Sequence, residues 1–465
     1  MKKHKKRALW LLVMLLSILL AVCFSSCEEN TLKSSHTHTF DQRVTDKKYL
    51  KKYADCLSPL TYFYSCVCGE KGSESFEEGS LGDHAWNEEN VCKICDARVD
   101  AGLRFSLNDD ETYTVVGYEG TQSTLHIPSA YKGLPVTKIA PGAFSECFAI
   151  QHVSLADSIE SIGNFAFRDC SLLVTIDLGE GLTELGAFAF WGCSSLSSIV
   201  IPDSVTNMGE GAFSQCTSLE SVVLSENTTS IGSSTFSSCE ALTAVTVPAS
   251  VTSIGTAAFS SCTNLASVSV EEGVEALGKG VFQYCVSLSH ITIPDSVTAL
   301  EEYAFLACTA LETVDVGDGV KSIGPSAFYD CKNLVTVTLG ESLERVDERA
   351  FQNCEKLSEI VFPDGVKKIG NSVFMDCPSL SRVTIGAGVT EIGSYAFARC
   401  TGLISVTMGQ GVTYIGRFAF VDCTNLVTFH YAGTKQAWGK ITKDFEWSNS
   451  VGDYTVYCAD GTLDE

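Results

Sequence analysis

Hydrophobic residues recur with a period of 23 residues over most of the chain. Cysteine marks the period, at Cys147, Cys170, Cys193, Cys216, Cys239, Cys262, Cys285, Cys308, Cys331, Cys354, Cys377, Cys400 and Cys423. A phenylalanine stands three residues before each of these cysteines, and a leucine three residues after each one except the first, where Ile150 takes its place. This regularity predicts a repeat protein in which every 23-residue unit adopts the same local structure.

Each unit combines two hydrophobic spacings. The unit that starts at Cys193 has apolar residues at Leu196, Ile199, Ile201, Val205, Met208, Ala212 and Phe213. Ile199 and Ile201 are two residues apart, as on one face of a strand, whereas the grouping of Ala212, Phe213 and Cys216 suits a helical or 3₁₀ turn. A glycine such as Gly209 or Gly255 often follows the last apolar residue, where a turning chain needs freedom in φ or close backbone approach.

The unit is therefore predicted to be a strand, a bend and a short helical turn. One unit cannot bury its own apolar edge, but stacked units share a continuous core. The predicted fold class is an α/β repeat solenoid, with one short parallel strand per 23-residue coil and helical or 3₁₀ turns on the convex side. With strands about 4.8 Å apart, thirteen coils would extend roughly 60 Å.

The repeat pattern is L-x-x-I-x-I-P-x-x-V-x-x-I-G-x-x-A-F-x-x-C, and it resembles the BspA-like leucine-rich repeats, a 23-residue bacterial class. The resemblance covers residues 113–430 and implies a leucine-rich-repeat horseshoe. Residues 113–144 resemble the family's imperfect first coil, and residues 431–465 resemble its C-terminal cap. An open solenoid end exposes core and strand edge, so both caps are physically required. Glu301 and Asp347 depart from the pattern by replacing the glycine.

The recurring cysteines are not expected to form disulfides. Equivalent residues of adjacent coils lie about 5 Å apart, but their side chains run parallel instead of facing each other. Phe167, Cys170 and Leu173 form one apolar stripe at three-residue spacing. We therefore predict a column of reduced, buried thiols in which cysteine acts as a small apolar filler.

The N-terminus resembles a bacterial lipoprotein leader. Five Lys and Arg precede an apolar run that ends in small residues and a cysteine, the layout of an export signal in residues 1–26. The resemblance implies lipidation of Cys27, which fits the pattern better than Cys23, a short tether over residues 27–35, and an exported protein anchored to the outer face of the cell membrane. An ordinary signal peptide and an uncleaved membrane anchor are the alternatives.

Residues 36–98 are rich in cysteine and histidine and resemble the small zinc-ribbon modules of exported bacterial proteins. One tetrahedral Zn²⁺ site is predicted from His38, Cys56, Cys66 and Cys68, and a second half-site without an identified fourth ligand from His84, Cys92 and Cys95. Disulfides are the main alternative in an exported protein, and a catalytic metal is the weakest reading because no H-E-x-x-H motif is present. A short acidic linker over residues 99–112 follows.

Composition and charge narrow the classes of function. Apolar residues make up 45% and charged residues 19% of the 465 residues, which argues against wholesale disorder. The formal net charge of −24, with no basic patch beyond the leader, excludes nucleic acid as a partner on electrostatic grounds.

Outward-facing strand residues are predicted to line the concave face of the solenoid. They are mostly serine and threonine, which favour strands in their own right, so a plain solvated sheet surface is one reading. The other reading is a shallow binding groove, with candidate ligand-binding residues His152, Asp177, His290, Asp315, Glu359, Arg382 and His430. His290, Asp315 and a nearby serine are not a convincing hydrolase triad, because neither an oxyanion hole nor a pocket is indicated.

The predicted function is non-enzymatic binding at the cell surface. The resemblance implies adhesion to surface or matrix proteins, or glycans, of a host or neighbouring cell. A passive spacer or coat component is one alternative, and an accessory or sensor acting through the Cys/His module is another. The ligand and the oligomeric state stay open.

Overall fold

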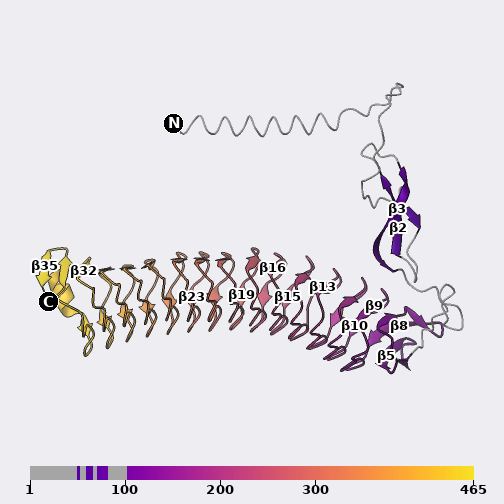
Figure 1. The fold of residues 1–465 in the computed structure, drawn as a ribbon. Helices are drawn as coiled ribbons and strands as arrows, with labels where there is room; N and C mark the ends of the chain where they lie inside the picture. The colour runs from indigo at the N-terminus through magenta and orange to yellow at the C-terminus, as the bar shows by residue number, and fades with distance from the viewer. Residues whose placement is uncertain (1–49, 53–58, 66–70, 82–101, 465) are drawn as a thin grey trace, which may run out of the picture. The chain divides into compact units, whose positions relative to one another are not determined.

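The computed structural model describes residues 50–52, 59–65, 71–81 and 102–464 (Figure 1). The chain divides into two compact units after Gly82. In the first unit, strands β1 (Leu50–Lys52), β2 (Pro59–Ser65) and β3 (Lys71–Leu81) form an antiparallel sheet in the order β1-β2-β3. The second unit is the repeat region with its two ends, and it carries the candidate binding face described below.

The second unit opens with a cap of longer strands. β4 (Leu103–Leu107) pairs antiparallel with β5 (Tyr113–Tyr118), and β5 pairs parallel with β8 (Leu134–Ile139), on which the short β7 (Ala130–Tyr131) folds back. Phe105 stacks on Tyr131 with ring centroids 4.0 Å apart. The strand β4 lies within residues 99–112, the predicted linker, so the ordered cap begins before Tyr113.

Every coil after the cap contains a strand that pairs in parallel with the equivalent strand of at least one neighbouring coil. These are β6 (Thr124–Ile127), β9 (His152–Leu155), β11 (Thr175–Asp177), β13 (Ser198–Val200), β14 (Ser221–Val223), β16 (Ala244–Val247), β18 (Ser267–Val270), β20 (His290–Ile293), β22 (Thr313–Val316), β24 (Thr336–Thr338), β26 (Glu359–Val361), β28 (Arg382–Ile385), β30 (Ser405–Met408) and β32 (Thr428–Tyr431). Paired residues between β9 and β32 are 23 positions apart, as in His290 and Thr313, so the sequence period is the register of the sheet.

A second, two-residue strand follows in nearly every coil, so the prediction of one strand per coil was wrong. These strands are β10 (Ser161–Ile162), β12 (Glu184–Leu185), β15 (Ser230–Ile231), β17 (Ser253–Ile254), β19 (Ala276–Leu277), β21 (Ala299–Leu300), β23 (Ser322–Ile323), β25 (Arg345–Val346), β27 (Lys368–Ile369), β29 (Glu391–Ile392), β31 (Tyr414–Ile415) and β33 (Thr442–Lys443). From β15 onwards they form one ten-stranded sheet. The molecule is a parallel β-solenoid, and the bend predicted between strand and turn is itself a strand.

The third side of each coil consists of consecutive turns instead of the predicted helical or 3₁₀ segment. Phe165 and Asp169 have left-handed backbones, with φ of 58° and 54°, which interrupt any helical run. The Phe167 amide donates to the Ala189 carbonyl of the next coil at 2.7 Å instead of closing a helical bond. Within the described residues, the one α-helix is α2 (Lys435–Lys440), beyond the repeats.

The recurring glycine serves close backbone approach and not freedom in φ. A Cβ atom added to Gly255 would lie 2.5 Å from the backbone nitrogen of Ser233 in the preceding coil, nearer than real Cβ contacts allow. Gly255 is not among the residues with positive φ. Glu301 and Asp347 occupy the same position in other coils, and the Asp347 amide donates to Ile323 of the preceding coil at 2.9 Å, as the Gly255 amide does to Ile231 at 2.8 Å.

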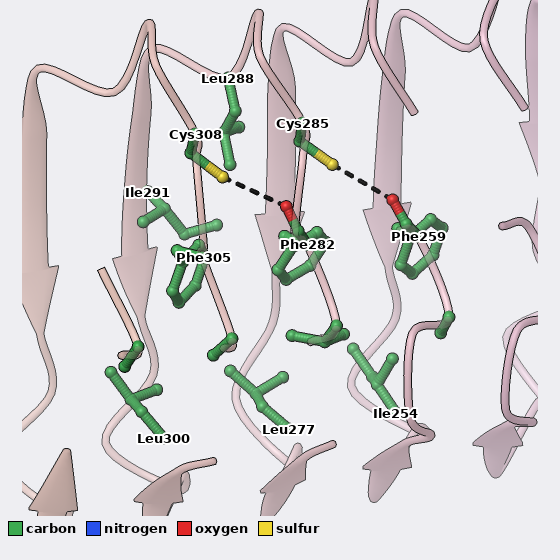
Figure 2. Close-up of a cluster of buried hydrophobic side chains, with 14 of the residues drawn as sticks. Ile254, Phe259, Leu277, Phe282, Cys285, Leu288, Ile291, Leu300, Phe305 and Cys308 are labelled. Atoms are coloured by element: carbon green, nitrogen blue, oxygen red, sulfur yellow. Dashed lines mark hydrogen bonds between the residues drawn. The ribbon is translucent and has the colours of Figure 1, made fainter. Parts of the chain in front are cut away.

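The core is a column of stacked phenylalanines beside a column of thiols (Figure 2). The rings from Phe144 to Phe420 stack coil on coil with centroids 4.8–5.6 Å apart. Each thiol from Cys170 to Cys423 donates to a phenylalanine carbonyl of the preceding coil at 3.0–3.4 Å, as Cys308 does to Phe282.

These thiols are buried and unpaired, which confirms the predicted reduced column. The description of cysteine as an apolar filler was incomplete, because the S–H group is also a hydrogen-bond donor between coils. Burial raises the pKa of Cys216 and Cys262 to about 12, so both stay protonated and able to donate at neutral pH.

The C-terminal end is closed by α2 and two further strands. Thr434 caps the helix by accepting the Ala437 amide. β34 (Thr455–Cys458) pairs parallel with β32, and β35 (Gly461–Asp464) pairs antiparallel with β34. The ring of Trp447 stands perpendicular to Phe420 at 5.9 Å and ends the stack.

Candidate binding face

We call the outward surface of the longer strands, from β9 to β32, the strand face. Two outward residues per strand form it, in two rows: His152, Thr175, Ser198, Ser221, Ala244, Ser267, His290, Thr313, Thr336, Glu359, Arg382, Ser405 and Thr428, and Ser154, Asp177, Val200, Val223, Thr246, Ser269, Thr292, Asp315, Thr338, Val361, Thr384, Thr407 and His430. All are exposed except Ser154, Ser405 and Thr428, which are half-buried. The prediction that these rows point away from the core is confirmed.

The structure brings few of the candidate ligand-binding residues together. Glu359 and Arg382 face each other on β26 and β28 with Oε2 and Nη2 2.6 Å apart. His152 and His430 make other local contacts: the former hydrogen-bonds Thr175 at 2.9 Å, and the latter stacks on Tyr457 at 5.2 Å. These are contacts between neighbouring strands and do not enclose a pocket.

His290 and Asp315 are not aligned as a catalytic pair. In the register of β20 and β22, His290 lies opposite Thr313, and Asp315 lies opposite Thr292. The hydrogen bond described for the His290 ring is with the hydroxyl of Ser289, at 3.1 Å. Asp177 likewise engages its own turn, where its carboxylate accepts the Gly179 amide at 3.2 Å.

The strand face is divided into five hydrogen-bonded segments. The segments begin at β6, β13, β16, β20 and β26, and the ladder is absent between β11 and β13, β14 and β16, β18 and β20, and β24 and β26. Each of these first strands is followed directly, or after one residue, by a proline: Pro128, Pro202, Pro248, Pro294 and Pro363.

A proline follows the first strand after each of these interruptions. At the same position in some other coils the amide donates to the preceding coil, as Glu271 does to Val247 at 3.1 Å and Gly409 to Ile385 at 2.9 Å. Proline has no N–H and cannot make that bond, but Gly317 and Gly340 do not make it either and their strands still pair, so the missing bond contributes to an interruption without being its sole cause. The prolines can be seen in the repeat pattern, but the interruption of the ladder beside each of them can be recognised only once the parallel register of the coils is known.

Three of the interruptions open into shallow hollows. The hollow between β14 and β16 measures about 310 Å³, the one across β16, β18 and β20 about 320 Å³, and the one between β24 and β26 about 370 Å³. Core-facing side chains are half-exposed at these places, and they are Val222, Val268, Val270, Val337 and Leu339. Their counterparts in intact segments, such as Val314 and Val383, are about 98% buried or more.

The interruption between β11 and β13 is different. Ile176 and Leu178 beside it keep 8% and 3% exposure, and the Ser197 amide still donates to the Val174 carbonyl at 3.2 Å. The loss of one proline hydrogen bond therefore does not by itself expose the core. The outward rows were predicted from the sequence, whereas the half-exposed core residues were not.

The predicted lipid and metal sites lie outside the described residues. These sites are Cys27 and the Zn²⁺ ligands His38, Cys56, Cys66, Cys68, His84, Cys92 and Cys95. Within the described ranges, no group of three or more His, Cys, Asp or Glu side chains could hold a metal ion. A search of the same ranges finds no helix of the length and hydrophobicity that a membrane crossing requires.

Comparison with known proteins places the repeats in a family. The profile described as "BspA type Leucine rich repeat region (6 copies)" matches residues 137–263, 229–357 and 321–442. Among solved structures, a leucine-rich repeat protein from Bacteroides ovatus is 26% identical, with a TM-score of 0.58 over 77% of this chain and 98% of its own. No curated protein matches the chain.

Two further solved structures have lower structural similarity. A leucine-rich cell surface protein from Faecalibacterium prausnitzii is 28% identical, with a TM-score of 0.41 over 74% of this chain and 97% of its own. The pneumococcal vaccine antigen PcpA is 21% identical, with a TM-score of 0.48 over 75% and 96% of the two chains. The family profile spans most of the chain and the register repeats every 23 residues, so this chain belongs to the BspA-type leucine-rich-repeat family.

Proposed function

We propose that this chain is an exported, non-enzymatic surface protein that binds proteins of a host or neighbouring cell through the strand face. The observation that carries the proposal is the strand face itself, where outward side chains repeat over thirteen coils and are almost all exposed. Small hydroxylated side chains contribute little each, so affinity must come from many contacts along the solenoid. Glycans are the second class of ligand to be tested.

Binding assays with outward-facing substitutions test this function. The purified chain is screened by biolayer interferometry against matrix proteins and glycans, and the variant Thr292→Glu/Thr338→Glu is compared with the native chain. Both threonines are exposed on the strand face, so the charges should weaken binding at least tenfold without unfolding the protein. Ala276→Glu, on the exposed side of the short strand β19, is the matched control and should bind normally.

The outcome separates binding from passive roles. Saturable binding that the strand-face variant loses and the control keeps supports the proposal. Failure of every probe to bind would support a spacer or coat component. Loss of function on deleting residues 36–98, with the solenoid still folded, would instead assign activity to the Cys/His module.

Two N-terminal features complete the proposal. Cys27 carries the lipid that anchors the chain at the outer face of the membrane, and Zn²⁺ stabilises the module of residues 36–98 through the cysteines and histidines named above. The support is the leader-like pattern of residues 1–26 and the ligand types and spacing of the module. An unmodified Cys27 in the mature protein, found by mass spectrometry, contradicts lipidation. A zinc content below one per chain contradicts the metal.

A further inference from the structure

The three hollows on the strand face have the features of side-chain anchoring sites. Each lies at an interruption of the ladder that is marked by a proline, and the apolar side chains of its floor correspond to residues that are buried in intact segments: Val222 in the first, Val268 and Val270 in the second, Val337 and Leu339 in the third. Exposure of apolar core residues costs free energy that an apolar partner group would recover by covering them.

The surface beside the hollows is strongly acidic. The tenth residue after the cysteine is Asp or Glu in nine of thirteen coils, at Asp157, Glu180, Asp203, Glu226, Glu272, Asp295, Asp318, Glu341 and Asp364, and all nine are exposed. We call these residues the acidic row. Several of its aspartates have a structural role, since Asp295 and Asp318 accept amides of the next coil. Glu226 and Glu341 line the first and third hollows.

Positive charge is nearly missing from the same surface. In the two outward rows of the strand face, Arg382 is the one Lys or Arg, and it is paired with Glu359. A partner seated here meets three apolar hollows, of which the first and third are lined in part by carboxylates, on a surface with an acidic row. Charge complementarity therefore favours a partner with apolar and basic side chains over a neutral or anionic one.

Resting on the proposed binding function, we propose that the three hollows anchor one extended polypeptide segment that carries apolar side chains separated by basic ones. The segment runs across the strands, along the solenoid. The first two hollows are two coils apart and the third lies three coils further, which corresponds to roughly 10 Å and 14 Å. Successive side chains of an extended chain point to opposite faces, so the residues that enter neighbouring hollows must be an even number of positions apart, and four positions cover about 13 Å.

The probe is a synthetic peptide built to this pattern. It carries leucines four positions apart, so that all of them point to one face of the extended peptide, separated by lysine and serine, and a scrambled peptide of the same composition is its control. We expect the patterned peptide to bind the full chain at least tenfold more tightly than the scrambled one, by fluorescence anisotropy. Equal binding of both peptides would mean charge attraction only and would overturn the proposal.

Proline replacement closes a hollow without altering any side chain that lines its floor. Pro248→Ala restores an amide that can pair with the preceding coil and join β14 to β16, so peptide affinity should fall about tenfold, the effect of losing one buried leucine. Pro202→Ala is the matched control, because Ile176 and Leu178 beside it are already buried. Hydrogen exchange of the backbone amide that the Pro248→Ala substitution introduces reports whether the ladder has closed.

A second variant tests the proposal independently if Pro248→Ala does not restore pairing between β14 and β16. Thr246 is exposed and lines both the first and second hollows, so Thr246→Trp fills them from outside and should weaken the peptide more than tenfold. Unchanged affinity in Thr246→Trp, or equal losses in Pro248→Ala and Pro202→Ala, would overturn the proposal. If a matrix protein still binds through the strand face while the patterned peptide does not, the anchoring proposal fails and the proposed function stands.

Discussion

Alkaline pH should unfold the solenoid sharply, because its thiol column ionises only when the chain opens. Burial raises the pKa of eleven thiols: Cys193, Cys216, Cys239, Cys262, Cys285, Cys308, Cys331, Cys354, Cys377, Cys400 and Cys423. The ordinary value is 9.0, and Cys216 reaches about 12. A pKa raised on folding means that stability is unaffected by these groups below pH 9 and is lost as pH rises towards 12.

The size of the effect follows from proton linkage. Each thiol that is ionised only in the unfolded chain lowers the free energy of unfolding by about 1.4 kcal/mol per pH unit. If the coils unfold together, eleven thiols give roughly 15 kcal/mol per pH unit above pH 9, which is as large as the whole stability of a typical domain. If only one coil opens, the slope is about 1.4 kcal/mol per pH unit. The slope therefore also measures how many coils unfold as one unit.

Guanidinium unfolding followed by circular dichroism between pH 7.5 and pH 10.5 measures this slope. The control variant replaces Cys216, Cys262, Cys377 and Cys423 by alanine, which removes four ionising groups and leaves the tyrosines and lysines in place. Its slope should be smaller by about 1.4 kcal/mol per pH unit for every replaced thiol in the unfolding unit. The reasoning would be refuted if the native chain and the variant lost stability equally with pH.

Three further predictions concern the core and the surface. Phe282→Ala, which removes a fully buried ring stacked 5.5 Å from both neighbours, should cost about 3–5 kcal/mol in chemical unfolding, and a loss under about 1 kcal/mol would contradict the stacked core. Glu359→Gln/Arg382→Gln should shift Tm by less than about 2 °C, since both side chains are more than half exposed; a larger shift would show that the pair is structural. Within the repeats, iodoacetamide at pH 8 should modify the half-buried Cys147 and spare the buried thiols, as mapped by peptide mass spectrometry, and modification of Cys170 in the folded chain would argue against the buried column.

The structural features that recur in every 23-residue coil could be predicted from the sequence. Phe167, Cys170 and Leu173 were assigned to one apolar stripe from their spacing, and all three are fully buried. The outward rows followed from the period-two alternation of the longer strands. These features depend on a residue type that recurs at the same position of every coil, so they appear in the sequence as a regular spacing.

Features that depend on contacts between coils could not be predicted. A two-residue strand such as Ser253–Ile254 has one inward residue and shows no alternation to detect. The turns were predicted as helical because their apolar spacing is helical. The left-handed residues that interrupt a helix there include Phe165 and Asp169, and because they are not glycines the sequence does not mark these positions as left-handed. The hollows lie where the ladder between neighbouring coils is interrupted, and these places can be located only once the parallel register of the coils is known.

The distance between two hollows depends on the number of coils between the prolines beside them, so it changes by one strand spacing whenever a coil is gained or lost. Because the sheet register equals the repeat length, recombination between two copies of the repeat in the gene can add or delete whole coils without disturbing those that remain. Each such event would move two hollows apart or together by one strand spacing, about 4.8 Å. The solenoid can in this way be matched to partners of different length by changing the number of units, while the residues within each unit stay the same.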